Sequence, residues 1–446
     1  MVSIIVFSFD GSEQLAHCVE TIESVTSQEH EVLEAPARSL RGRILTLPEA
    51  LNRAASSASG EYLVFLTADT VPGPGWLDRL IACAQGTGAG AVGPLCNMAA
   101  GLQNASVALT PGTVLSPDPT RWRPSVRIAI TPMLVKRDAF VDVGGFDERF
   151  GSEGFADDDF CLRLAHSGRR AYIAGDVYIH RNGPRHPLQG EPERVRILDG
   201  EARRMCTKWG LDDPMAAHPR RDVLGLVDVA GKKVLDVRAR TGATLLECAA
   251  RGARLATGVE EDRRLRAVAL TYCGTPAGHE SGKPGLAGSQ SDTCDGTSLH
   301  ILKSLKEAAA HRPYDLVIAI WHLECMTNPV AYLKRLKPLL AEGGVLLACV
   351  RNAWALSRLL PLLLTAPPPT YPRPAWGPCA APDDVLLWFE EAGFEVTNIK
   401  TAYAPPLGKE PFLDGFLKLV RNHGFMEDPK PEFYSDECWF TAVLAQ

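Results

Sequence analysis

Apolar runs of strand length alternate with amphipathic stretches of helical period along the chain, which is the pattern of an α/β protein. The prolines and glycines at residues 72–75 also predict the start of a helix. In the N-terminal half the pattern predicts strands at residues 2–7, 62–66 and 128–135 and helices at 16–25, 76–83 and 160–166.

The alternation breaks at residues 211–222, where Asp-Asp-Pro and His-Pro-Arg-Arg interrupt the period, and it then restarts. Strands are predicted there at 233–237, 255–260, 314–320 and 344–350 and helices at 244–251 and 329–340. Parallel strands need helical crossovers, so this order predicts an open, doubly wound sheet. We therefore expect two domains, residues 1–212 and 223–446, joined by a linker at 213–222.

Two segments of unusual composition interrupt the second half. Residues 274–290 are rich in glycine and serine, and residues 367–378 are rich in proline. Because loops of this length are either functional or mobile, we expect both segments at the surface.

The composition excludes several classes of protein. With 46% hydrophobic and 22% charged residues, the chain has the balance of a packed globular protein. Its net charge of −6 is spread without a basic block, so neither nucleic acid nor an anionic membrane is expected as a partner. The longest apolar stretch, around residues 359–364, is far shorter than the ~20 residues of a membrane-spanning helix. None of the twelve cysteines forms a C-x-x-C pair, which argues against a zinc or dithiol site and for a cytoplasmic location.

Asp69 is the first residue with candidate chemistry, because it closely follows a predicted buried strand. Ligands of open α/β sheets bind beyond the carboxyl ends of the strands. A divalent cation that bridges a diphosphate needs one or two oxygen ligands from the protein, and Asp69 can supply one. The alternative is that Asp69 is a turn residue or helix N-cap before Trp76.

Three adjacent carboxylates, Asp157, Asp158 and Asp159, stand where a helix is predicted to start. The helix dipole favours them there, and a carboxylate near a sugar hydroxyl can also remove its proton. His180 directly follows a predicted strand and is either structural or a ligand. Arg181 is expected on the solvated surface, with contact to a phosphate as the alternative.

Taken in order, these segments resemble the family 2 glycosyltransferases of GT-A fold over residues 2–210. The resemblance implies an N-terminal fold that binds nucleotide-diphosphate sugars. The motifs that carry it are Leu51-Asn-Arg-Ala-Ala55, residues 58–66, the Asp69 segment, Gly144-Gly-Phe-Asp147, the aspartates at 157–159 and Lys208-Trp-Gly210.

The family's D-x-D motif falls on Thr67-Ala-Asp69, with threonine in place of the first carboxylate. The resemblance implies that Asp69, together with His180, holds Mg²⁺ or Mn²⁺. It further implies that Asn52, Thr67 and Asp69 bind the nucleotide sugar. Glu34 is expected to replace the aspartate that reads the base in the family.

The family's Glu-Asp motif falls on Ala156-Asp157, so its glutamate is missing and Asp157 matches the general base. The resemblance implies an inverting single displacement. The cation on Asp69 neutralises the leaving nucleoside diphosphate, and Asp157 deprotonates an acceptor hydroxyl on a glycan, peptide or metabolite. Asp158 and Asp159 are expected to cap the helix and orient the acceptor.

Residues 234–242 (VLDVRARTG) resemble the Val-Leu-Asp-x-Gly-x-Gly-Thr-Gly signature of class I methyltransferases, which use S-adenosylmethionine. The resemblance implies a Rossmann-like methyltransferase fold with Asp236, Gly242 and Glu260 as cofactor-binding residues. It continues through Gly258-Val-Glu260, residues 314–317, His322-Leu-Glu324, Glu342-Gly-Gly344 and residues 391–396, and covers residues 223–443.

Two glycines of that signature are replaced by Arg238 and Arg240. Glycine lets the backbone approach the cofactor in conformations that other residues avoid. We therefore expect a degenerate accessory domain, with S-adenosylmethionine binding left open, whose arginine pair grips an anion or is surface charge. Two alternatives are a bifunctional glycosyltransferase/methyltransferase and a non-catalytic scaffold in which both sites have decayed.

Overall fold

The computed structural model divides the chain into two compact units. The first comprises Met1–Pro219 together with Thr241–Leu246 and Arg263–Cys273, and the second comprises the remaining segments. The expected loops at 274–290 and 367–378 lie almost wholly outside the described residues. The structure describes residues 1–8, 12–35, 38, 42–99, 101–105, 109–130, 132–151, 154–183, 192–274, 293–294, 297–355, 378–403, 418 and 435–445.

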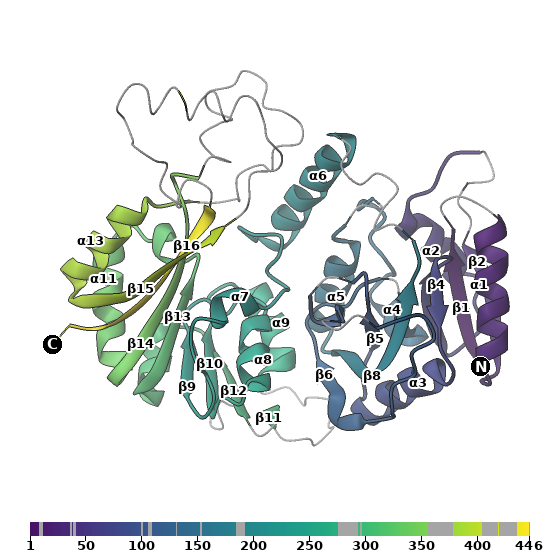
Figure 1. Cartoon of the computed structure of the whole chain (residues 1–446), viewed down its shortest axis with the longest axis horizontal. Helices are drawn as coiled ribbons and strands as arrows, with labels where there is room; N and C mark the ends of the chain where they lie inside the picture. The colour runs from purple at the N-terminus through teal and green to yellow at the C-terminus, as the bar shows by residue number, and fades with distance from the viewer. Residues whose placement is uncertain are drawn as a thin grey trace. The chain divides into compact units, whose positions relative to one another are not determined.

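The first unit is built on a mixed sheet with the strand order β2-β1-β3-β7-β5-β8-β4, and β6 pairs with β8 (Figure 1). Its strands are β1 (Val2–Phe7), β2 (His30–Ala35), β3 (Tyr62–Thr67), β4 (Thr70–Pro72), β5 (Ala91–Cys96), β6 (Trp122–Pro124), β7 (Met133–Lys136) and β8 (Ala171–Arg181). Its helices include α1 (Ser12–Val25), α2 (Leu47–Ala55), α3 (Trp76–Thr87), α4 (Arg137–Asp142), α5 (Ala156–His166) and α6 (Pro192–Trp209). The parallel pairing of β1 with β2 and β3 brings the carboxyl ends of these strands to one edge.

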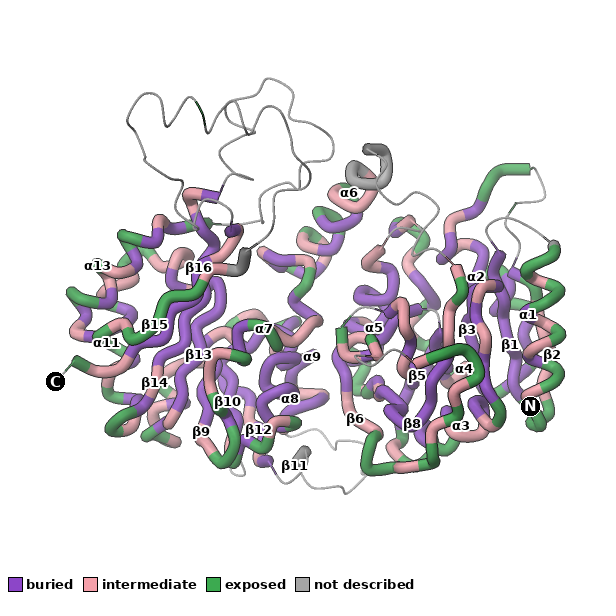
Figure 2. The backbone as a smooth tube through the Cα atoms, in the orientation of Figure 1, coloured by how far each residue is buried: buried purple, intermediate pink, exposed green. Residues whose placement is uncertain are grey.

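An aromatic cluster on one face of this sheet anchors the helices nearest the candidate site. Phe65 of β3 contacts Phe140 and Phe146, with ring centroids 5.3 and 5.0 Å apart, and Phe160 of α5 lies 4.9 Å from Phe146. The opposite face is covered by α1 and α3, whose buried side chains pack on β1, β3, β5 and β8. The strands are consequently buried along most of their length (Figure 2).

The second unit contains a sheet with the strand order β11-β12-β10-β9-β13-β14-β16-β15. Strands β12, β10, β9, β13 and β14 are parallel, and β16 is antiparallel to both of its neighbours. The strands are β9 (Lys233–Asp236), β10 (Leu255–Val259), β11 (Thr293–Cys294), β12 (Thr297–Leu302), β13 (Tyr314–Ile320), β14 (Leu340–Arg351), β15 (Phe394–Tyr403) and β16 (Ser435–Leu444).

Helices α11 and α13 pack on this sheet and bury a continuous core against β13, β14 and β16 (Figure 1). This unit also includes α7 (Arg221–Leu224), α10 (Leu305–Ala308), α11 (Pro329–Leu336) and α13 (Pro382–Ala392). Helix α8 (Ala243–Ala250) is divided between the units, and α9 (Arg263–Tyr272) belongs to the first. In the described part of the chain, no helix combines the length and the apolar character needed to cross a bilayer.

The predicted α/β architecture is confirmed, and the predicted strands 2–7 and 314–320 match β1 and β13. The strand predicted at 128–135 is wrong in its first half, because β7 begins only after Pro132, which cannot donate a ladder hydrogen bond. The helix predicted at 160–166 begins earlier, at Ala156, since acidic side chains stabilise the first turn of a helix. All three aspartates therefore lie inside α5.

Replacing Phe160 with alanine tests the aromatic anchor of α5. Phe160 is fully buried, so we expect Phe160→Ala to lower the free energy of unfolding by about 3–5 kcal/mol. Urea denaturation followed by circular dichroism measures the change. Val141→Ala in α4 is the control because Val141 is 65% exposed; equal effects of the two substitutions would contradict the anchoring role.

Candidate functional site

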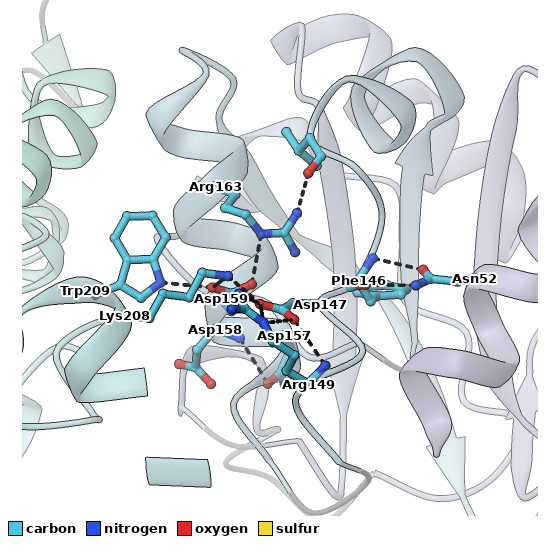
Figure 3. Close-up of polar contacts among 11 residues, drawn as sticks. Asn52, Phe146, Asp147, Arg149, Asp157, Asp158, Asp159, Arg163, Lys208 and Trp209 are labelled. Atoms are coloured by element: carbon cyan, nitrogen blue, oxygen red, sulfur yellow. Dashed lines mark hydrogen bonds and ion pairs between the residues drawn. The ribbon is translucent and has the colours of Figure 1, made fainter. Parts of the chain in front are cut away.

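The start of α5 is a strained turn that leads directly into three buried carboxylates. Phe155, the N-cap residue, has φ 63°, a left-handed conformation that is uncommon for a bulky residue. Such strain persists only where the surrounding structure enforces it, and it is often found at functional sites. Asp157, Asp158 and Asp159 follow in the first helical turn (Figure 3).

Asp157 is paired with Arg127, a residue that the sequence analysis did not single out. Arg127 Nη2 donates to Asp157 Oδ2 at 2.5 Å, and each side chain is 12% exposed. Burial raises the pKa of Asp157, and the negative charge of Asp158 adds to this, while the Arg127 guanidinium partly offsets both. Asp157 is thus a carboxylate with increased proton affinity beside a fixed positive charge.

Asp158 lies between the side chains of Arg127 and His218. Arg127 Nε is 3.4 Å from Asp158 Oδ2, and Nε2 of His218 is 3.4 Å from Oδ1. Burial alone would raise the pKa of Asp158, but Arg127 and His218 outweigh it, so the pKa is lowered. Asp158 therefore remains ionised and holds Arg127 in place for Asp157.

Asp159 is the structural member of the three (Figure 3). Its side chain is fully buried and accepts hydrogen bonds from Arg163 Nε at 2.8 Å and Trp209 Nε1 at 3.0 Å. Lys208 Nζ lies 2.6 Å from Asp159 Oδ1 and also donates to Asp147 at 2.7 Å. The motif residues around positions 147, 159 and 208 thus form one charged network that fixes α5 to α6.

Asn52, expected to bind the nucleotide sugar, uses its amide inside the protein. Its Nδ2 donates to the Phe146 carbonyl at 2.8 Å and to Glu148 Oε1 at 3.0 Å, and its Oδ1 accepts from the Phe146 amide at 2.9 Å. Gly145 has φ 67°, and a Cβ there would lie 2.8 Å from Asn52 Oδ1. Asn52 therefore clamps the Gly144-Gly-Phe turn (Figure 3), and nucleotide binding by it stays a prediction.

Asp69 lies in the turn between β3 and β4, as the sequence predicts, but its partner is Arg181. Arg181 Nε donates to Asp69 Oδ1 and Oδ2 at 3.2 and 3.1 Å, and Nη2 lies 3.0 Å from Oδ2. His180 is the neighbouring residue on β8, and its Nδ1 is 2.8 Å from the Tyr178 hydroxyl. No hydrogen bond or ion pair between described residues joins Asp69 to His180 or to Asp157.

The residues around Asp69 do not fit a preformed site for Mg²⁺ or Mn²⁺. Thr67 has no carboxylate, both oxygens of Asp69 contact Arg181, and Nδ1 of His180 is hydrogen-bonded to the Tyr178 hydroxyl, which leaves Nε2 as the imidazole nitrogen that could bind a metal. Within the described ranges, no group of three or more His, Cys, Asp and Glu side chains could hold a metal ion. Mg²⁺ also demands near-octahedral oxygen ligation. The metal ligands expected at Asp69 and His180 therefore stay a prediction, and no chemical step here depends on a metal.

The other two expected nucleotide-sugar residues lie at the carboxyl ends of parallel strands. Glu34 is an exposed residue near the end of β2. Thr67 ends β3 and is buried, and its Oγ1 has no hydrogen-bond partner in the described part of the chain. Their placement agrees with the general position of ligand sites in open sheets, and their roles stay predictions.

The second unit has its own charged cluster at the carboxyl ends of β9 and β10. Asp236 ends β9, is buried, and accepts from the Arg238 amide at 3.0 Å; burial raises its pKa to about 6. Glu260 follows β10, and its two oxygens accept from the backbone amides of Arg240 and Asp262, both at 2.8 Å. The protein thus supplies one hydrogen bond to each oxygen of Glu260, and the cofactor-binding roles of Asp236, Gly242 and Glu260 stay predictions.

Trp321 directly follows β13, and three arginine side chains lie close to its ring. The guanidinium carbons of Arg220, Arg240 and Arg351 lie 4.5, 5.1 and 4.8 Å from the centroid of its ring. Trp321 and Arg240 both have positive φ, 49° and 51°. Arg238 Nη1 donates to the Trp321 carbonyl. Cation–π attraction stabilises such a stack.

These residues do not fit S-adenosylmethionine. Arg240 keeps the positive φ that glycine normally adopts but adds a side chain, and Trp321 with its arginines lies at the strand ends where the family binds its cofactor. Gly242 retains φ 81°, yet a Cβ there would lie only 3.3 Å from Cys273 Sγ, so this glycine also serves packing.

The partners of the predicted acids could not be found from sequence patterns. Arg127 and His218 lie 30 and 60 residues from Asp157 and Asp158, in segments without a recognised motif. Trp321 gave no signal either. Only the two arginines at glycine positions of the methyltransferase signature indicated such a cluster. A large charged side chain at a glycine position needs a partner nearby.

Comparisons with known proteins find similarity to two different families in different parts of the chain. Residues 40–99 match the sequence profile of glycosyl transferase family 2, and residues 202–399 match a profile described as a methyltransferase domain. The family 2 glycosyltransferase domain is thus found at residues 40–99 and the methyltransferase domain at residues 202–399. The chain's two sheets are a GT-A-like and a Rossmann-like methyltransferase fold.

Individual relatives are distant or cover short regions. The O-antigen biosynthesis protein RfbC of Myxococcus xanthus is 33% identical over 164 residues, which are 33% of this chain and 13% of that protein. The crystal structure of GalNAc-T7 with UDP, GalNAc and Mn²⁺ is 16% identical with a TM-score of 0.34, covering 44% of this chain and 47% of that one. A putative S-adenosylmethionine-dependent methyltransferase from Listeria monocytogenes is 13% identical with a TM-score of 0.33, covering 51% and 97%. Neither TM-score by itself establishes a shared fold.

The chain is expected not to bind S-adenosylmethionine. Isothermal titration of the full chain should give no saturable heat, because the side chains of Arg240 and Trp321 lie together at the strand ends where the family binds its cofactor. The double variant Arg238→Gly/Arg240→Gly, which restores the family's glycines, should gain measurable affinity. Stoichiometric binding of S-adenosylmethionine by the unchanged chain would contradict this prediction and favour the bifunctional alternative.

Proposed function

We propose that the chain is an inverting glycosyltransferase that moves a sugar from a nucleotide-diphosphate donor to an acceptor hydroxyl. The observation that carries this proposal is the Asp157–Arg127 pair on the strained turn at Phe155. It is supported by the family 2 glycosyltransferase domain in the same half of the chain. A carboxylate with a raised pKa beside a fixed cation suits a general base better than a purely structural role.

In the proposed reaction, Asp157 accepts the proton of the acceptor hydroxyl as that oxygen attacks the anomeric carbon of the donor sugar. The bond from this carbon to the diphosphate oxygen breaks, and the nucleoside diphosphate leaves with the bonding electrons. Arg127 and Asp158 hold Asp157 in position. Attack from the face opposite the leaving group inverts the configuration.

We further propose that residues 223–446 form an accessory domain that does not methylate, with residues 1–212 carrying the transfer. The stack of arginines on Trp321 supports this proposal. The 33% identity with part of RfbC supports a glycan acceptor in the synthesis of a surface polysaccharide. A non-catalytic scaffold predicts instead that no nucleotide sugar is consumed.

Replacing Asp157 with asparagine should reduce sugar transfer by about 10²–10⁴-fold, since the acceptor hydroxyl then lacks its general base. Release of nucleoside diphosphate from a panel of nucleotide sugars, with glycan acceptors, measures the loss. Binding of the donor should be retained. Glu61→Gln, at an exposed carboxylate of the same unit, is the matched control. Unchanged turnover in the Asp157→Asn variant would remove Asp157 from the mechanism.

The pH profile of turnover should report the ionisation of Asp157. The base is active when deprotonated, and burial raises its pKa, so the rate should fall on acidification at a pH above the usual carboxyl range. Arg127→Gln removes the charge that opposes this rise and should move the acid limb to higher pH. Arg127→Lys, which keeps the charge, should leave the limb closer to that of the unchanged chain. An acid limb that is the same in all three proteins would contradict the assignment.

A further inference from the structure

Asp69 is engaged on both of its oxygens by a single cationic side chain. The contacts of Arg181 Nε and Nη2, at 3.0–3.2 Å, form the forked pairing that guanidinium groups make with carboxylates. The two side chains are 12% and 16% exposed. Water therefore screens this pair much less than it screens a surface ion pair.

The backbone around the pair is also held in place. Asn97 accepts a hydrogen bond from the Arg181 amide at 2.9 Å and donates one to the Arg181 carbonyl at 3.0 Å. The Asn182 amide donates to the Asp69 carbonyl at 2.8 Å, and Thr70 of β4 is opposite Arg181 in the antiparallel register. Arg181 thus has a fixed position at the end of β8.

The space that a cation would need beside Asp69 is restricted. A Cβ on Gly183 would lie 2.5 Å from Asp69 Oδ2, so the backbone of Gly183 packs directly against the carboxylate. Arg181 contacts the same oxygen. Thr67 supplies no second carboxylate. Among the described residues, the contacts of the Arg181 guanidinium are made by Nε and Nη2, and Nη1 carries two further N–H donors.

We propose that Arg181, oriented by Asp69, binds the diphosphate of the donor and offsets its charge as it leaves, in the place where the family's pattern has a divalent cation. This inference rests on the proposed function and names the group that recognises the diphosphate. Guanidinium matches phosphate oxygens in geometry and stays charged at any physiological pH. Asp69 then positions Arg181 and does not bind a metal.

Titration calorimetry of the full chain with UDP, dTDP, GDP and CDP tests the proposal, each in EDTA and in MnCl₂. At least one nucleoside diphosphate should bind, with the same affinity in both buffers. Arg181→Gln should weaken that binding by about tenfold or more, the effect of losing charge-assisted hydrogen bonds, and should raise the KM for the donor. Arg181→Lys should recover part of the affinity, which shows that the fold is intact. Arg121→Gln, at an exposed arginine of the same unit, should have no effect.

The Asp69→Asn variant distinguishes phosphate binding by Arg181 from metal binding by Asp69. If Arg181 is the phosphate ligand, Asp69→Asn should weaken binding less than Arg181→Gln does. Binding that requires Mn²⁺, or that is abolished by Asp69→Asn but kept by Arg181→Gln, would overturn the role of Arg181 and leave the proposed function standing. A chain that binds none of the four diphosphates in either buffer would contradict both.

Discussion

Three adjacent carboxylates can be buried at the start of α5 only because each is matched by a cation. An unpaired buried carboxylate is strongly unfavourable, and the usual outcome is that it takes up a proton. Here Arg127 is shared by Asp157 and Asp158, whereas Arg163 and Lys208 serve Asp159. As a result, the pKa of Asp157 is raised and that of Asp158 is lowered. Neighbouring carboxylates whose pKa values are shifted in opposite directions are typical of sites that carry out acid–base catalysis.

Arginine recurs where the family resemblances imply another partner. In the first unit Arg181 is the partner of Asp69, in place of the expected metal. In the second unit Arg240 takes the backbone conformation of a glycine, and its guanidinium lies on Trp321. The chain therefore keeps the acids of both family patterns, Asp69 and Glu260, while changing the groups that they face.

The architecture was largely predictable because hydrophobic period and strand length depend on local sequence. The runs at 2–7 and 314–320 became strands with the expected bounds, and Asp69 lies beyond β3 as its sequence context implies. The pairing of the acids was not predictable, since Arg127 and His218 reach them only through the tertiary fold. The same holds for Asn52, whose motif resembles a ligand site but whose amide clamps a turn 94 residues away.

The configuration at the donor's anomeric carbon after the reaction shows whether the chain is an inverting glycosyltransferase. The full chain is mixed with each of a panel of nucleotide-diphosphate sugars, and the anomeric proton is followed by NMR before mutarotation mixes the products. We expect that one donor is consumed and that its sugar, on the acceptor or released to water, has the inverted configuration. Retention of configuration, or survival of every donor intact, would contradict it.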